Sequence, residues 1–243
     1  MKKIIVTLLK ILLFLIFIFS FTLKEFYVIK KEHKNNNRME SVENLINKID
    51  LKKVDNLMIV AHPDDDMIWG GGHLIEDNYL VICITCGTVK KRVKEFQNVM
   101  NETNDKYIML GYPDLTEGKR DDWASSYSKI ENDIEYIIKF KKWKMIVTHN
   151  PDGEYGHQHH KMTNRIVTDK SIKNNIEDSL YYFGKYYTKN EKEKLNYTIP
   201  EIDKDIFEEK KKVLKLYVSQ KKVIDSFSHM LPHEDFISYH NWS

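Results

Sequence analysis

Two short segments of the sequence bring together histidines and carboxylates, the side chains that bind metals and transfer protons. The first reads Ala61-His62-Pro63-Asp64-Asp65-Asp66, and the second, residues 149–160, contains four of the ten histidines of the chain. Imidazole and carboxylate ligands suit zinc, and three protein ligands with one open position are typical of a catalytic zinc site. His62 and Asp65 with one histidine of the second segment would form such a set. Asp64, which is not needed as a ligand, would then act as a general base toward a water molecule.

Each segment also has an ordinary structural interpretation. Acidic turns after strands often cap helices, because aspartate accepts hydrogen bonds from free backbone N–H groups, and this role fits Asp66 best. A histidine-rich loop is frequently just solvated surface. The two segments are more informative together, because both follow strands that we expect to end at one edge of a sheet.

Apolar, partly β-branched runs alternate with helical patterns between residues 57 and 148. We expect strands at 57–61, 79–85, 107–110 and 145–148, and helices at 89–101, 127–140 and 203–227. This order predicts an α/β fold with a Rossmann-like, doubly wound, mostly parallel sheet. Ligands of such sheets bind at the carboxyl ends of the strands, and the two segments directly follow the strands that end near residues 61 and 148.

These segments resemble the motifs of the PIG-L or LmbE-like family of zinc-dependent N-acetylglucosaminyl deacetylases. Residues 61–66 look like the family's A-H-P-D-D-(E/D) motif, and residues 152–160 look like its G-H-P-D-H segment, with His157 and His160 matching the two histidines. Further similarities are R-x-x-E at residues 92–95, L-G-x-x-D at 110–114 and an S-Q motif at 217–220. The resemblance covers roughly residues 55–236.

The resemblance implies a zinc site and a role for each matching residue. The zinc ligands would be His62, Asp65 and His160. Asp64 would be the general base, and a protonated His157 would stabilise the oxyanion. Arg92 and Asp114 would hydrogen-bond sugar hydroxyls. Asp64 or His157 would then protonate the departing amine. Ordinary interpretations of Arg92 and Asp114 are a surface ion pair and a turn aspartate.

The second segment departs from the family pattern between its paired histidines. The family often has Pro-Asp there, whereas this chain has Gln158-His159. A carboxylate that tunes His157 would therefore have to be Asp152 or Glu154. His159 could compete as a metal ligand, but its side chain should point away if a helix begins here.

An apolar run near the N-terminus predicts a membrane segment. Residues 4–23 are apolar except for Lys10, Thr7, Ser20 and Thr22, and a helix of this length spans roughly 30 Å, about one hydrocarbon core. We expect a single-pass anchor at residues 1–23, a polar stalk at 24–45 and the deacetylase domain at 46–243. A cleaved secretory signal remains an alternative, although no convincing small-residue cleavage site follows the run.

The charge distribution bears on orientation and on partners. Residues 1–38 carry eight Lys or Arg against two Glu, while the rest of the chain carries 30 basic and 34 acidic residues. The remainder lacks the positive field that nucleic-acid binding normally needs, so DNA and RNA are not expected partners. The basic residues after the span favour a cytoplasmic domain. The short basic segment before the span is typical of a signal anchor, which would export the domain, and we favour the outer face.

These observations predict a membrane-anchored, zinc-dependent hydrolase that removes the N-acetyl group from a GlcNAc-containing glycan or glycolipid. Another divalent metal could replace zinc. Two alternatives stay open: a GlcNAc-phosphatidylinositol-type deacetylase that faces the cytosol, and a non-catalytic glycan-binding module of the same fold.

Overall fold

The computed structural model describes residues 40–242 of the 243-residue chain. The expected membrane segment at residues 4–23 and most of the expected stalk lie outside these residues. Within residues 40–242, no helix combines the length and the apolar character needed to cross a membrane. A compact unit begins at Val42, because α2 (Val42–Ile46) buries Val42 and Ile46.

The centre of this unit is a six-stranded sheet in the order β3-β2-β1-β6-β7-β8. The parallel strands are β1 (Asn56–Val60), β2 (Tyr79–Thr85), β3 (Lys106–Tyr112), β6 (Met145–Thr148) and β7 (Leu180–Phe183), and β8 (Phe236–Ser238) pairs antiparallel with β7. Every residue of β1 and β2 is buried, which explains why both strands are mostly apolar in the sequence. The expected α/β fold with a mostly parallel sheet is confirmed.

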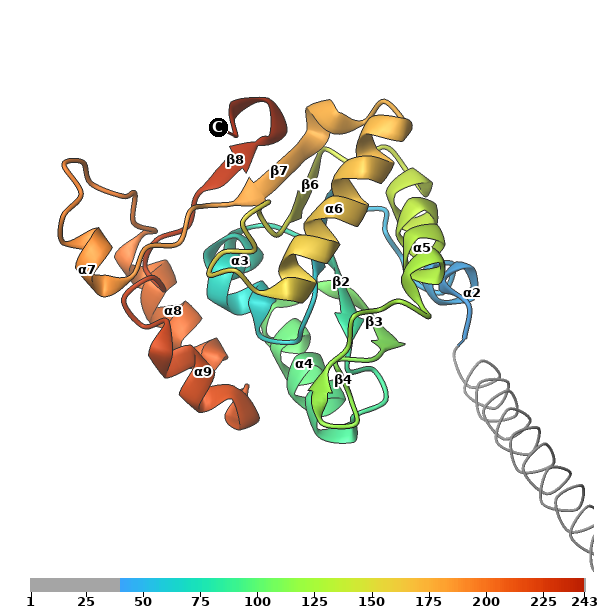
Figure 1. Ribbon diagram of the computed structural model, residues 1–243, viewed down its shortest axis with the longest axis horizontal. Coiled ribbons are helices and arrows are strands. Elements are labelled where there is room, and N and C mark those ends of the chain that lie inside the picture. The colour runs from blue at the N-terminus through green and yellow to red at the C-terminus, as the bar shows by residue number, and fades with distance from the viewer. Residues whose placement is uncertain (1–39, 243) are drawn as a thin grey trace, which may run out of the picture. The chain divides into compact units, whose positions relative to one another are not determined.

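Helices follow the strands and cover the sheet. They are α3 (Asp65–Glu76) after β1, α4 (Lys90–Thr103) after β2, α5 (Tyr127–Lys139) after β3 and α6 (Gln158–Lys173) after β6. α5 packs against α6, whereas α3 packs against α8 (Lys204–Leu214), as Figure 1 shows. The chain moves from β1 outward to β3 and then returns to β6 on the other side of β1. This reversal makes the carboxyl ends of β1 and β6 the topological switch point, where open α/β sheets bind ligands.

Glycines in α3 let this helix lie close to its neighbours. Gly70 has non-helical backbone angles, and a Cβ atom there would lie only 2.7 Å from Cε of Met58 in β1. A Cβ atom at Gly71 would lie 3.1 Å from Lys210 of α8. The close packing fixes the position of α3, whose first residue is Asp65, against both β1 and α8.

The C-terminal part of the chain differs from the expected single helix at 203–227. α8 ends at Leu214, and a 3₁₀ turn η2 (Val218–Gln220) and a short helix α9 (Lys221–Ser226) follow. Tyr217 lies at the break, is buried, and donates its hydroxyl to both carboxylate oxygens of Asp66, at 2.8 and 2.9 Å. The expectation was wrong because this buried hydrogen bond, which the local pattern does not reveal, accompanies the interruption of the helix.

The remaining elements are short. They are the hairpin β4 (Leu115–Thr116) and β5 (Lys119–Arg120), the helix α7 (Lys189–Lys192), and the 3₁₀ turns η1 (Glu177–Ser179) and η3 (Tyr239–Asn241). The hairpin follows β3, so it begins at the same edge of the sheet as the switch point.

Candidate metal centre

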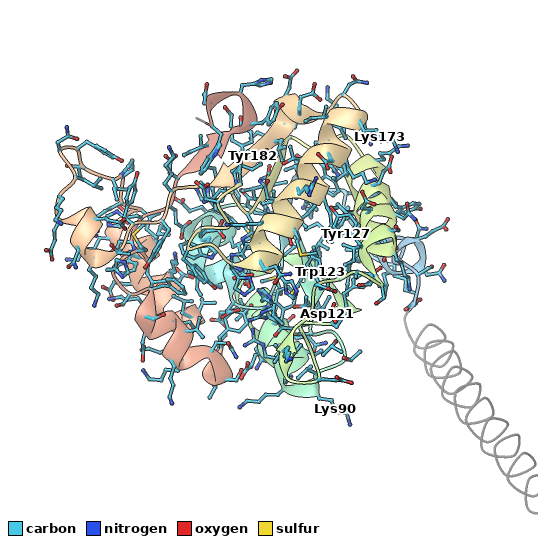
Figure 2. The ribbon with its side chains drawn as sticks, in the orientation of Figure 1. Lys90, Asp121, Trp123, Tyr127, Lys173 and Tyr182 are labelled. Carbon is cyan, nitrogen blue, oxygen red and sulfur yellow. The ribbon has the colours of Figure 1, made fainter. Side chains whose placement is uncertain are left out.

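The switch point brings the two His/Asp segments side by side. The centroid of the His62 ring lies 4.7 Å from that of His157, 5.3 Å from that of His159 and 5.4 Å from that of His160. His62 follows β1, and the other three histidines lie at the start of α6. Figure 2 shows Asp121 and Trp123 beside this end of α6, and His159 contacts both. The predicted convergence of the segments is confirmed.

Hydrogen bonds fix which nitrogen of His62 carries a hydrogen. Nε2 of His159 lies 2.7 Å from the carbonyl oxygen of Asp121, which can only accept, so Nδ1 of His159 has a free lone pair. Burial, together with His62, lowers the pKa of His159 to about 4, which keeps this ring neutral. Nε2 of His62 faces that lone pair at 3.1 Å and the carboxylate of Asp114 at 3.2 Å, so it must carry the hydrogen. In the neutral ring, Nδ1 of His62 therefore presents a lone pair to Oδ2 of Asp65, 3.2 Å away.

Glu154 fixes the hydrogen of His160 in the same way. Burial alone would raise the pKa of Glu154, but His149 and His160 outweigh it and lower the pKa to about 2, so the group is a carboxylate. It accepts hydrogen bonds from Nδ1 of His149 at 2.9 Å and from Nδ1 of His160 at 2.5 Å. Nε2 of His160 is buried without a hydrogen-bond partner among the described residues and lies 3.2 Å from Oδ1 of Asp65, so in the neutral ring it presents a lone pair to that oxygen.

Three groups of side chains place possible ligand atoms within 4.8 Å of one another. These groups are His62, His157 and His160; Asp65, His149 and His160; and His62, Asp114 and His159. Nε2 of His149 accepts from the backbone N–H of Ala61 at 3.0 Å and lies 3.4 Å from Oδ2 of Asp65. In their neutral forms, His62 and His160 present lone pairs to the two oxygens of Asp65.

Such an arrangement fits a cation. Facing lone pairs repel one another unless protons or a positive ion lie between them. Zinc bonds of 2.0–2.2 Å in a tetrahedral site separate neighbouring ligand atoms by about 3.4 Å, close to the 3.2 Å found here on each side of Asp65. Glu154 and Asp114 would serve as the outer carboxylates that commonly orient histidine ligands.

Asp64 lies in a strained turn next to this set. Its φ of 130° is rare outside glycine, and such strain is concentrated at functional sites. Burial, and then the charge of Asp65, raise the pKa of Asp64 to about 7. The carboxyl group can therefore both take up and release a proton near neutral pH.

Arg92 lies behind Asp64 and has protein partners. Its Nη2 lies 3.1 Å from Oδ1 of Asp64 and also donates to the carbonyl of Pro63, and its Nη1 lies 3.3 Å from Oγ of Ser219. Its side chain is 11% exposed. The structure thus brings Arg92 to the expected general base, whereas we had expected a contact with a sugar.

The R-x-x-E and S-Q motifs of the sequence meet at this point. Glu95 accepts hydrogen bonds from the backbone N–H of Ser219 at 2.8 Å and from its Oγ at 2.5 Å. These contacts hold the segment after α8 against α4. The motifs therefore support the turn that carries Asp64, through Arg92.

Asp114 and His157 lie at the site with contacts that we did not expect. Asp114 pairs with Arg120 and faces His62, so its carboxylate is engaged by protein groups. His157 is the N-cap of α6, and its Nδ1 accepts from the backbone N–H of His159 at 3.2 Å. Burial, and then the nearby His160 and His62, lower the pKa of His157 to about 2. A neutral ring that can donate through Nε2–H is favoured over the protonated ring that we expected.

Sequence reasoning missed two roles at this site. It considered Glu154 as a partner of His157, but the carboxylate contacts His149 and His160 instead. It assigned no role to His149, which is fully buried between Ala61 and Glu154. The sequence did contain a signal for His149, because this residue directly follows a predicted strand, as His62 does.

Comparisons with known proteins identify the family of this chain. The family model described as PIG-L, GlcNAc-PI de-N-acetylase, matches residues 57–171, which include both His/Asp segments. The uncharacterized protein L374 of Acanthamoeba polyphaga mimivirus is 32% identical over 206 residues, covering 78% of this chain and 82% of the relative.

Two solved structures share the fold at low sequence identity. The A40926 pseudoaglycone deacetylase Dbv21 is 15% identical with a TM-score of 0.54, covering 72% of this chain and 85% of its own. GalB, the 4-carboxy-2-hydroxymuconate hydratase of Pseudomonas putida KT2440, is 12% identical with a TM-score of 0.54, covering 73% and 84%. One is a deacetylase and the other a hydratase, so the fold alone does not select the reaction. The match of the family model and the identity to a relative over most of both chains show that this chain belongs to the PIG-L family.

Proposed function

We propose that this protein is a metal-dependent N-deacetylase that hydrolyses the N-acetyl group of a GlcNAc-containing glycan or glycolipid. The observation that carries the proposal is the placement of one ring nitrogen of His62 and one of His160 at 3.2 Å from the two oxygens of Asp65. Membership of the PIG-L family and the fold shared with a deacetylase support hydrolysis of an amide.

In this proposal His62, Asp65 and His160 hold the metal, zinc or another divalent ion. When bound, the ion would polarise the acetamide carbonyl and lower the pKa of a water molecule. The donor set of two imidazoles and one carboxylate supports this role, because it matches the ligands that zinc prefers in catalytic sites.

Asp64 and His157 would carry the proton chemistry. Asp64 takes a proton from the attacking water as the new C–O bond forms, and Arg92 orients it through the contact at 3.1 Å. His157 donates Nε2–H to the oxyanion of the tetrahedral intermediate. Asp64 then returns the proton to the nitrogen as the C–N bond breaks, which yields acetate and a free amine.

The apolar run at residues 4–23 supports a surface or lipid-linked substrate. We propose a single-pass anchor with the catalytic domain on the outer face. There are two alternatives: a GlcNAc-phosphatidylinositol-type deacetylase that faces the cytosol, and a non-catalytic glycan-binding module. Labelling of intact cells with a membrane-impermeant reagent distinguishes a domain on the outer face from one that faces the cytosol.

Acetate release tests the activity. The full-length, zinc-loaded protein is incubated with GlcNAc, N,N′-diacetylchitobiose and GlcNAc-phosphatidylinositol, beside the Asp64→Asn variant. We expect acetate from at least one substrate, and a drop in kcat of about 10²–10⁴-fold in Asp64→Asn with unchanged zinc content, because only the proton acceptor is lost. Asp55→Asn, whose exposed carboxylate pairs with Lys141 before the start of β1, at the opposite edge of the sheet, is the matched control and should keep full activity.

Two results would contradict this function. An Asp64→Asn variant as active as the wild type would remove Asp64 from the mechanism. Bound zinc with no acetate from any of the three substrates would favour the glycan-binding module.

A further inference from the structure

Exposed apolar side chains surround the metal centre. Within residues 40–242, eight large apolar side chains are exposed, and half of them lie close to a residue of the site. Single exposed apolar side chains are ordinary, whereas a group of them around one site marks a contact surface. These four are 43–68% exposed: Val89, Leu115, Tyr155 and Val218.

Two of these side chains follow strands that end at the site. Val89 comes shortly after β2 and is the N-cap of α4, and Arg92 in the first turn of that helix contacts Asp64. Leu115 begins the β4–β5 hairpin directly after Asp114, whose carboxylate faces the proposed metal ligands. Both side chains therefore lie at the edge of the sheet that carries the metal centre.

Contacts place the other two side chains at the same edge. Tyr155 precedes α6, and its ring centroid lies 5.5 Å from that of His160. Val218 lies in η2, where the backbone N–H of the next residue, Ser219, donates to Glu95 of α4 at 2.8 Å. This contact holds η2 against the first half of α4. Four separate segments thus place exposed apolar side chains around one site.

Three of these segments are strongly basic. Residues 89–94, 115–120 and 218–223 contain eight Lys or Arg and one acidic residue, Glu117. Outside them, residues 39–243 carry 22 basic and 33 acidic side chains, out of totals of 30 and 34. The positive charge of an otherwise acidic domain is therefore concentrated at the edge with the site. Five of these lysines are exposed and form no ion pair with another described residue: Lys90, Lys91, Lys94, Lys119 and Lys222.

The combination of exposed apolar and basic side chains fits an anionic lipid surface. Apolar side chains bind at the boundary between headgroups and acyl chains, while Lys and Arg are attracted to anionic headgroups. A soluble polyanion would use the lysines but not the apolar side chains. An uncharged protein partner would use the apolar side chains but not the lysines.

We propose that residues 89–94, 115–120 and 218–223, here called the basic rim, dock on an anionic membrane, so that the metal centre faces the lipid headgroups. This inference goes beyond the proposed function. The expected anchor at residues 4–23 would keep the protein at the membrane in any orientation, whereas the basic rim selects one. Docking requires neither turnover nor a bound metal, so it can be measured independently of the deacetylase activity.

Fluorescence quenching in lipid nanodiscs tests the orientation. The full-length protein is inserted into nanodiscs of phosphatidylcholine with about 30% phosphatidylglycerol, carrying a bimane label on Leu115→Cys, Val218→Cys or the control Ile172→Cys. Ile172 is also an exposed apolar residue, but it lies at the end of α6 remote from the site. Cys83 and Cys86 are buried, and the wild type treated with bimane gives the background. We expect lipids with a nitroxide headgroup to quench the first two labels at least about threefold more than the third.

The lipid charge and two lysines test the cause of docking. Omitting phosphatidylglycerol, or adding about 0.5 M NaCl, should reduce the quenching of the label at residue 115 at least about twofold, because the attraction is electrostatic. We expect the same reduction in Lys90→Glu/Lys91→Glu. The matched control is Lys142→Glu/Lys144→Glu, which makes the same charge change just before β6, at the opposite edge of the sheet, and should leave the quenching unchanged. Circular dichroism confirms that each variant is folded.

Three results would overturn docking: equal quenching of the three labels, quenching that does not depend on phosphatidylglycerol, or a folded Lys90→Glu/Lys91→Glu variant that is quenched like the wild type. Binding of soluble dextran sulfate without quenching in nanodiscs would assign the basic rim to a soluble polyanion and reject the membrane. Failure of the proposed function looks different, because the quenching pattern would persist while no substrate releases acetate.

Discussion

Asp64 and Asp65 are neighbours in the chain, but their surroundings shift the pKa values of the two carboxyl groups in opposite directions. Burial, and then Asp65, raise the pKa of Asp64 to about 7. Burial would also raise the pKa of Asp65, but His160 and His149 outweigh it and hold that pKa well below the usual value. Two carboxyl groups with separated pKa values can divide the roles of proton carrier and permanent anion, which is the division that the proposed mechanism needs.

Glu154 offers a test of the outer carboxylates at the residue scale. We expect Glu154→Gln to weaken zinc binding by about 10–100-fold, because a neutral amide orients His160 less firmly and lowers its basicity. Competition with a chromogenic chelator measures the affinity. Asp152→Asn, an exposed carboxylate two residues earlier, is the control and should bind zinc like the wild type. Equal affinities of Glu154→Gln and the wild type would show that Glu154 does not support the metal site.

At the scale of elements, Asp105 links the starts of β2 and β3. Its Oδ1 accepts from the backbone N–H of Tyr79 at 2.8 Å, its Oδ2 has no hydrogen-bond partner in the described chain, and burial raises its pKa to about 7. The folded chain therefore holds a proton that an unfolded carboxyl, with a pKa of about 3.9, releases. Stability should fall as the pH rises between these two values.

Replacing Asp105 by Asn tests this dependence. At pH 5 the folded acid is still protonated while the unfolded acid is mostly ionised, so we expect Asp105→Asn to be more stable than the wild type by roughly 1 kcal/mol. At pH 8 we expect this advantage to be larger by roughly 1–3 kcal/mol, because the wild type loses stability up to the folded pKa and the amide does not titrate. Urea denaturation at both pH values measures the difference, with Asp50→Asn as an exposed control that also accepts a backbone N–H. The prediction would be contradicted if the difference in the free energy of unfolding between Asp105→Asn and the wild type were no larger at pH 8 than at pH 5.

The sequence predicts the central elements better than the C-terminal ones for a physical reason. β1, β2 and β6 are buried strands whose apolar runs are visible locally. β8 has three partly exposed residues, and the break after α8 coincides with hydrogen bonds from Tyr217 to Asp66 and from Ser219 to Glu95. Partners more than 100 residues away leave no local pattern.

The same limit applies to the site. The sequence places His62, Asp65 and His160 at one edge of the sheet, because the order of strands and helices fixes which strand ends meet. It does not reveal the roles of Glu154 and Arg92. Those roles depend on the turn with φ of 53° at Glu154 and on the burial of Arg92 against Asp64, which only the folded chain defines.

At the scale of the whole molecule, we expect the apolar run at residues 4–23 to determine where the protein is located, whereas the proposed chemistry depends on residues after 61. We expect the full-length chain in the membrane fraction after an alkaline wash, and a chain starting at Met39 in the soluble fraction with its zinc retained, because all proposed ligands follow residue 61. The mass of the purified full-length protein distinguishes an intact anchor from a cleaved signal. A full-length chain that stays soluble with an intact N-terminus would contradict the anchor.

The central claim is that His62, Asp65 and His160 form a metal site, and the zinc content of the purified protein tests it most directly. The measurement is elemental analysis after reconstitution with zinc, for the wild type, His160→Ala and the exposed control His240→Ala. We predict about one zinc per chain in the wild type and in His240→Ala, and a loss of zinc in His160→Ala. No zinc in the wild type, or the same zinc content in His160→Ala, would contradict the metal centre and the hydrolytic mechanism built on it.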